Sequence, residues 1–123
     1  MEAASEHPRA ERAIGRENGP PGSVPPDFHA AIELIGRRWA GAILWTLAAR
    51  PHYFADLAAS VPGLSDRLLS RRLRELEAAG LVERSVEDGT PPRVSYALTE
   101  KGRSLEPALA ELRDWARDWK LSS

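Results

Sequence analysis

The chain has 123 residues, of which 42% are hydrophobic, and a formal net charge of −1; this length suits one packed domain and hardly two. It contains no cysteine, which excludes disulfides, thiolate nucleophiles, cysteine-based zinc sites and thiol redox sensing within these residues. No apolar run is long enough to span a membrane and no signal-peptide core precedes the first helix, so we expect a cytoplasmic protein.

Residues 1–25 differ in composition from the rest of the chain. They contain the run Gly19-Pro20-Pro21-Gly22, mixed charges and few large apolar side chains. Such a segment cannot bury enough apolar surface to offset the entropy of ordering it. We therefore predict a flexible tail over residues 1–25, with a short helix around residues 9–16, and one domain over residues 26–123. The charges of the tail nearly balance, which makes it a poor basic DNA-binding arm.

Hydrophobic spacing predicts three short helices at the start of the domain, at about residues 27–35, 38–49 and 53–60. Asp27 is placed to cap the first of them, and Pro51 stops the second. A turn at residues 61–63 then leads into a longer helix.

The longer helix is expected at Ser65–Ala79, with Ser65 as its N-cap and Gly80 as its C-terminal cap. Its core face is predicted from leucines spaced four and three residues apart, namely Leu69, Leu73 and Leu76. Between Leu64 and Arg74 there are four arginines and one aspartate, a local charge of +3. A recognition helix offers its N-terminal half to base edges and phosphates, and arginine can bind guanine or phosphate with two N–H groups. The candidate DNA-binding residues on this helix are Ser65, Arg67, Leu68, Ser70, Arg71 and Arg74.

A β-hairpin is predicted next, from a strand beginning at residues 81–82 and a return strand over residues 93–98. Beside a recognition helix such a hairpin forms a wing, and Arg93 is its candidate contact with the minor groove or the DNA backbone. Thr99 is expected to cap a final helix that Pro107 kinks or divides. The predicted fold is mainly helical with a small hairpin, in the order α-α-α-α-β-β-α of a winged helix-turn-helix.

Several segments, taken in order, resemble the HxlR-type regulators, which are relatives of the MarR regulators. They are AIELIGRRW at residues 31–39, PGLS at 62–65, LLSRRLRELEAAGLVER at 68–84, PPRVSYALTEKG at 91–102, and the pair Trp115 and Trp119. The resemblance covers about residues 26–119. It implies a winged-helix fold, homodimers held by the terminal helices, and binding to roughly palindromic operators with the helix at 65–79 in the major groove.

The chain departs from this resemblance at one functional point. Many similar proteins carry a redox-sensing cysteine just before the first helix, which here is the region near Pro26. Because the chain has no cysteine, the thiol switch of those proteins cannot be carried over to it.

A second set of apolar residues suggests either an effector pocket for a small aromatic or apolar molecule or a core and dimer interface. Its members are Phe28, Ile32, Ile35, Trp39, Trp45, Leu109, Leu112, Trp115 and Trp119. We favour a dimer interface built from the first and last helices, because helical interfaces need aromatic and aliphatic area. Trp45 lies off the main apolar stripe, so of the four tryptophans we expect it to be the one that is partly exposed or meets a ligand or partner chain.

Three functions are therefore compared. The first is a DNA-binding repressor or activator, of which we favour the repressor; the others are a winged-helix module that binds only protein and a small enzyme. The histidines are scattered, with His52 placed in a turn, and show no metal-ligand spacing; no catalytic cluster or glycine-rich phosphate loop is present. We expect no metal, cofactor or enzymatic activity. The four arginines between Ser65 and Arg74 favour DNA as the partner. A module that binds only protein would be expected to have apolar or mixed residues on this face.

Overall fold

The computed structural model describes residues 19–122, which fall into two compact units that divide between Leu34 and Ile35. In the first unit one helix, α1 (Pro26–Ile35), follows a turn at residues 19–22. The helix begins one residue earlier than predicted, so Asp27 lies in its first turn instead of capping it, and accepts a hydrogen bond from the amide of Phe28. The predicted tail with its short helix at 9–16 falls mostly outside the described residues.

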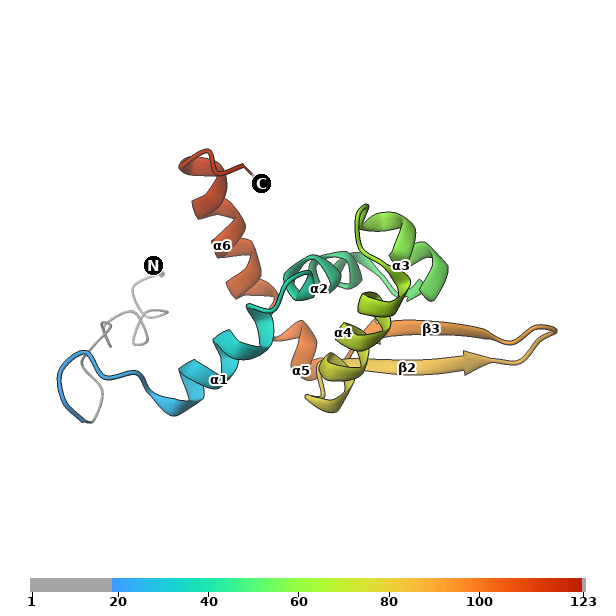
Figure 1. Cartoon of the computed structure of the whole chain (residues 1–123), viewed down its shortest axis with the longest axis horizontal. Coiled ribbons are helices and arrows are strands. Elements are labelled where there is room, and N and C mark those ends of the chain that lie inside the picture. Colours follow the sequence, from blue (N-terminus) through green and yellow to red (C-terminus); the bar gives the residue numbers. More distant parts are fainter. Residues whose placement is uncertain (1–18, 123) are drawn as a thin grey trace, which may run out of the picture. The chain divides into compact units, whose positions relative to one another are not determined.

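The second unit contains the remaining helices and all the strands of the described chain (Figure 1). They are α2 (Ala40–Ala49), β1 (His52–Tyr53), α3 (Phe54–Ser60), α4 (Asp66–Ala78), β2 (Val82–Glu87), β3 (Arg93–Leu98), α5 (Glu100–Arg103) and α6 (Glu106–Asp118). This mainly helical arrangement with a small antiparallel sheet confirms the predicted winged-helix class. None of the helices within residues 19–122 has the length and apolar character needed to cross a membrane.

The sheet has three strands in the order β1-β3-β2, and both pairs are antiparallel. The predicted hairpin of β2 and β3 is confirmed, but β1 was missed, since a strand of two residues has no periodicity. His52 consequently lies in a strand opposite Tyr96 and not in a turn. Its ring is buried, with Nδ1 2.8 Å from the carbonyl oxygen of Arg50.

The core of the second unit lies between α2, α3, α4 and the sheet. Its buried apolar side chains are Ala40, Ile43, Leu44, Leu47, Leu57, Val61, Leu64, Leu69, Leu73, Leu76, Leu81, Val82, Tyr96 and Leu98. The three leucines predicted for the core face of α4 are all among them, at 0–1% exposure. The burial of this leucine stripe fixes which face of α4 remains in solvent.

The second helix begins at Ala40, two residues later than predicted. Trp39 precedes it in a left-handed backbone conformation, with φ at 77°, so Arg38 and Trp39 belong to a turn. This turn is closed by the amide of Ala40, which donates to the carbonyl of Arg37. A large side chain rarely adopts positive φ, so nothing in the sequence marks Trp39 as a turn residue. The spacing of apolar residues therefore predicts that it lies inside the helix.

Pro107 was predicted either to kink or to divide the final helix, and the structure shows two helices in place of one. The chain forms α5, turns at residues 104–105, and starts α6 with Pro107 in its first turn. Proline is tolerated there because the first amides of a helix have no intrahelical partner. Thr99 caps α5 as predicted: its hydroxyl accepts from the amide of Gly102 and donates to the carbonyl of Gly80.

Candidate nucleic-acid interface

Both ends of α4 are fixed by local interactions. The hydroxyl of Ser65 accepts a hydrogen bond from the amide of Leu68 at 3.1 Å, which satisfies one of the free amides of the first turn. At the other end Gly80 adopts φ of 81°, the left-handed conformation that glycine allows after a helix. The predicted N-cap and C-terminal glycine are both confirmed, and they define a helix of 13 residues.

The face of α4 opposite the buried leucines carries the predicted basic residues. Arg67, Arg71 and Arg74 are exposed, as is Ser65, whereas Leu68 and Ser70 are half-buried at the margin of this face. The spacing of four and three residues places the three guanidinium groups on one side of the helix. Within residues 19–122, no ion pair involves any of these three arginines. We call Arg67, Arg71 and Arg74 the α4 basic face.

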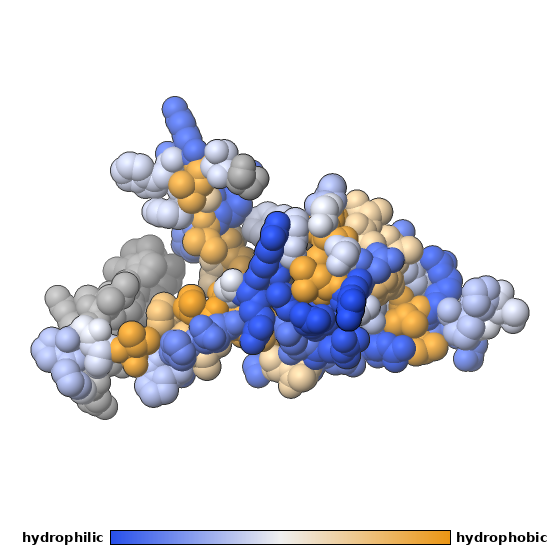
Figure 2. All heavy atoms as spheres, in the orientation of Figure 1, coloured by the Kyte–Doolittle hydropathy of each residue, from blue (hydrophilic) through white to orange (hydrophobic). Residues whose placement is uncertain are grey.

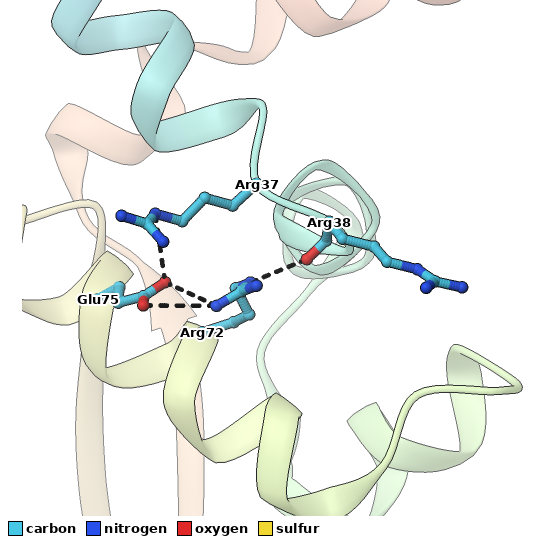
Figure 3. A network of polar contacts seen from close by, with 4 residues as sticks. All are labelled: Arg37, Arg38, Arg72 and Glu75. Atoms are coloured by element: carbon cyan, nitrogen blue, oxygen red, sulfur yellow. Dashed lines mark hydrogen bonds and ion pairs between the residues drawn. The ribbon is translucent and has the colours of Figure 1, made fainter.

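Arg72, the fourth arginine of α4, has a structural role. Its Nε donates to the carbonyl oxygen of Arg38 at 2.9 Å, and its Nη1 lies 3.2 Å from a carboxylate oxygen of Glu75 (Figure 3). The same carboxylate lies 3.9 Å from Nε of Arg37. The local charge counted from the sequence therefore overstates the charge offered to a ligand, because the charge of Arg72 is compensated by Glu75. This network also ties α4 to the turn before α2.

The wing carries a second set of polar contacts, which includes the residue predicted to touch DNA. The guanidinium carbon of Arg93 lies 3.5 Å above the ring centre of Tyr53, and the hydroxyl of Tyr53 donates to Glu87 at 2.8 Å. Glu87 is also the register partner of Arg93 in the hairpin. Arg93 is exposed but held over an aromatic ring. Sequence reasoning missed Tyr53 here because it placed this residue at the start of a helix.

The hydrogen bond with Glu87 also raises the pKa of Tyr53 above its ordinary value of 10.0, since the bond favours the protonated phenol. Partial burial and the negative charge of Glu87 act in the same direction, while Arg93 opposes them. Ionisation of the phenol above this raised pKa removes the donor, so the hydrogen bond to Glu87 should be lost at strongly alkaline pH.

An apolar groove lies between α2 and the α5–α6 segment. It has a volume of about 620 Å³ and is lined by Trp45, Ala48, Ala49, Arg103, Glu106, Pro107, Leu109 and Ala110. Two residues of the predicted effector or interface set, Trp45 and Leu109, meet in this groove. Trp39 does not line it; its indole lies against Gly63 in the turn between α3 and α4.

The remaining apolar residues of that set are mostly exposed. On α6 and just after it, Leu112, Trp115 and Trp119 are 57%, 53% and 72% exposed, and Figure 2 shows hydrophobic atoms along this helix. On α1, Phe28 and Ile32 are exposed and Ile35 is half-buried. Trp45 is 49% exposed and lines the groove, so it is partly exposed as expected, although Trp115 and Trp119 are more exposed. The sequence showed which residues are apolar but not that the end of α6 has no partner element within the second unit.

Comparison with known proteins decides the family. The profile of the HxlR-like helix-turn-helix family matches residues 34–123, which includes the whole of α2 to α6. The chain belongs to this family. It is accordingly a helix-turn-helix transcriptional regulator that binds DNA, and the resemblance inferred from its sequence motifs is confirmed.

Within the described residues, no group of three or more histidine or acidic side chains is arranged to hold a metal ion.

Individual relatives support the same assignment. The HTH-type transcriptional regulator YvaP of Bacillus subtilis is 42% identical over 94 residues, which cover 76% of this chain and 87% of that protein. The HTH-type transcriptional regulator YodB of the same organism is 40% identical and covers 74% of this chain and 81% of its own length.

Solved structures of similar proteins agree with the fold. The reduced form of YodB superposes with a TM-score of 0.70 at 38% identity, covering 76% of this chain and 92% of that one. The reduced form of the redox regulator HypR superposes with a TM-score of 0.72 at 34% identity, and the match covers 75% of this chain and 91% of HypR.

Proposed function

We propose that this regulator is a cytoplasmic homodimer that represses transcription by binding a pseudo-palindromic operator through the α4 basic face. The observation that carries the proposal is the set of three exposed guanidinium groups, without ion pairs in the described chain, opposite a fully buried leucine stripe. The alternative, a winged helix that binds only protein, is less well supported because this face has charges where a protein partner would be met by apolar side chains.

Each residue of the α4 surface has a role that its chemistry allows. Arg67, Arg71 and Arg74 can bind guanine through O6 and N7 or hold a phosphate. Ser65 and Ser70 are short donors suited to phosphate oxygens, and the half-buried Leu68 can meet a thymine methyl group. Arg93 is assigned to the wing, where stacking on Tyr53 keeps its guanidinium in one place.

The direct test compares Arg71→Ala with Arg93→Ala in anisotropy titrations on a duplex selected from a random library. Arg71→Ala is expected to weaken binding by about 1–3 kcal/mol and relax the preference at one base position. Arg93→Ala should weaken binding to selected and random duplexes by a similar factor, since a wing contact to the backbone carries no base code. Arg113→Ala, an exposed arginine on α6, is the control. Unchanged binding by both test variants would show that the DNA surface lies elsewhere.

Homodimerisation is supported by the exposed apolar side chains of α6 and, separately, of α1. Light scattering of the protein at micromolar concentration should give twice the chain mass of 13.5 kDa. Replacing Trp115 with glutamate should shift the protein to monomers, because a charge cannot be buried unpaired in an apolar interface. Val86→Glu is the matched control, since Val86 is also about half exposed but lies on β2. A monomeric native protein contradicts this part of the proposal.

Regulation is proposed to depend on a small aromatic or apolar effector and not on a thiol of this chain. HypR is described as a redox regulator, but the present chain contains no cysteine. The groove of about 620 Å³ between α2 and the α5–α6 segment has the size and apolar lining of a small-molecule site. The same groove adjoins α6 and is also a candidate part of the dimer interface.

A further inference from the structure

We propose that Arg38, which lies outside the recognition helix, binds a backbone phosphate of the same DNA duplex. The inference rests on the proposed function and extends it by a residue in the turn before α2. Arg38 is exposed, and no ion pair involves its side chain within residues 19–122. Its neighbour Arg37 differs, because the guanidinium of that residue is engaged by Glu75.

The main chain of Arg38 is held against α4. Its carbonyl oxygen accepts the hydrogen bond from Nε of Arg72, whose guanidinium is itself fixed by Glu75. Figure 3 shows the side chain of Arg38 pointing away from this network. The backbone is therefore positioned by the recognition helix, while no ion pair from residues 19–122 engages the charge.

The side chain of Arg38 is also guided toward the N-terminal end of α4. Its guanidinium carbon lies 5.1 Å from the ring centre of Trp39. That ring in turn lies against Gly63, where a β-carbon would be only 3.6 Å from Cη2 of the indole. Gly63 is two residues before Ser65, the N-cap of α4. The contacts thus lead from Arg38 through Trp39 to the end of α4 that carries Arg67 and Arg71.

The conformation of Trp39 suggests that this placement is maintained at a cost. A positive φ is unfavourable for a bulky residue and persists only where the surroundings enforce it. Here the flanking carbonyls of Arg37 and Arg38 are both used, by Ala40 and Arg72 respectively. Arginine suits the resulting position, because a guanidinium over an aromatic face still presents its N–H edge to a phosphate.

A phosphate of the bound duplex is the ligand we assign to Arg38. The α4 basic face occupies the groove in the proposed complex, and the phosphates that border the groove lie next to the ends of the recognition helix. An arginine beside the N-terminal end of α4 is therefore closer to the phosphates of the DNA backbone than to the base edges inside the groove. Its contribution should therefore be independent of sequence and strongly dependent on salt.

The test is the salt dependence of affinity for a labelled duplex of random sequence, measured by anisotropy. Each phosphate contact contributes about 0.9 to the slope of log K against log salt concentration. Because a homodimer carries two copies, Arg38→Ala should reduce the magnitude of the slope by about 1.8. It should also weaken binding to random and selected duplexes by the same factor. Arg38→Lys keeps the charge and should retain most of the slope, and Arg37→Ala, the adjacent arginine, should change it less than Arg38→Ala does.

The outcomes separate this inference from the proposed function. If Arg71→Ala weakens binding while Arg38→Ala leaves affinity and slope unchanged, the assignment of Arg38 is overturned and the proposed function stands. If the native protein binds no duplex at any salt concentration, both are overturned. Circular dichroism melting of Arg38→Ala should match the native protein, because the substitution retains the carbonyl that Arg72 uses.

Discussion

Replacing Gly102 with alanine is expected to destabilise the protein by about 3 kcal/mol, near the upper end for an overpacked interior. A β-carbon at this position would overlap the carbonyl oxygen of Leu81 and would lie 3.2 Å from Cδ2 of Leu98. Gly102 is buried in α5. The obstructing group is main chain and not the end of a flexible side chain, so the strain can be relieved only by moving a strand or a helix.

The surrounding hydrogen bonds explain why that movement is costly. The carbonyl of Leu81 accepts from the amide of Thr99, and the hydroxyl of Thr99 donates to the carbonyl of Gly80. Lys101 adds a hydrogen bond from Nζ to the carbonyl of Ala79 at 2.8 Å. The start of α5 is thus attached to the turn that ends α4, and separating them would break several bonds together.

Denaturant unfolding followed by circular dichroism measures the effect of Gly102→Ala. Gly41→Ala is the matched control, because Gly41 lies in α2 and a β-carbon there would meet nothing within 4 Å. Alanine at that helical position should be neutral or stabilising by about 0.4–1 kcal/mol. Equal stability of the native protein and Gly102→Ala would show that α5 does not pack on the α4–β2 turn as described.

Removing the whole α4 basic face is expected to abolish sequence-specific DNA binding. If each arginine that contacts a base contributes about 1–3 kcal/mol, the combined change of Arg67, Arg71 and Arg74 to alanine should lower affinity by more than about a hundredfold. The salt slope should also fall, because these residues supply much of the positive charge near the DNA. The three side chains are exposed, so the fold should be preserved and its melting temperature nearly unchanged.

The control for this variant must alter net charge equally. Changing Arg113, Arg117 and Lys120 to alanine removes three exposed positive charges on and beyond α6. This variant should keep specific binding to a selected duplex. If both triple variants lose affinity to the same extent, overall charge and not the face of α4 governs binding.

Elements of the fold could be predicted where the residues that determine them are close together in the sequence. The helix α4 could be predicted because its leucine spacing, N-cap and terminal glycine all lie within one short segment. The strand β1 could not, because its two residues become a strand only by pairing with β3, more than forty residues later in the chain. The start of α2 was misplaced because Trp39 is held in its left-handed conformation by contacts with distant residues.

The same distinction applies to the candidate site. That Arg67, Arg71 and Arg74 face solvent follows from the position of the leucines on the same helix. That Arg72 is engaged by Glu75 and Arg38 depends on how α4 packs against the turn before α2. The stacking of Arg93 on Tyr53 depends on the third strand of the sheet. Sequence patterns therefore predict a helix rich in arginine, and tertiary packing determines which of these arginines is paired within the described chain.

Selection from a library of random duplexes with the purified native protein will show whether α4 recognises a DNA sequence. If α4 is the recognition helix, the selection should enrich a sequence with two related half-sites about one helical turn apart, as expected for a dimer that places two recognition helices in successive major grooves. The Arg67, Arg71 and Arg74 triple-alanine variant should enrich no such sequence. A native protein that leaves the library unchanged, or a triple variant that enriches the same sequence, would contradict the assignment of α4 as the element that recognises DNA.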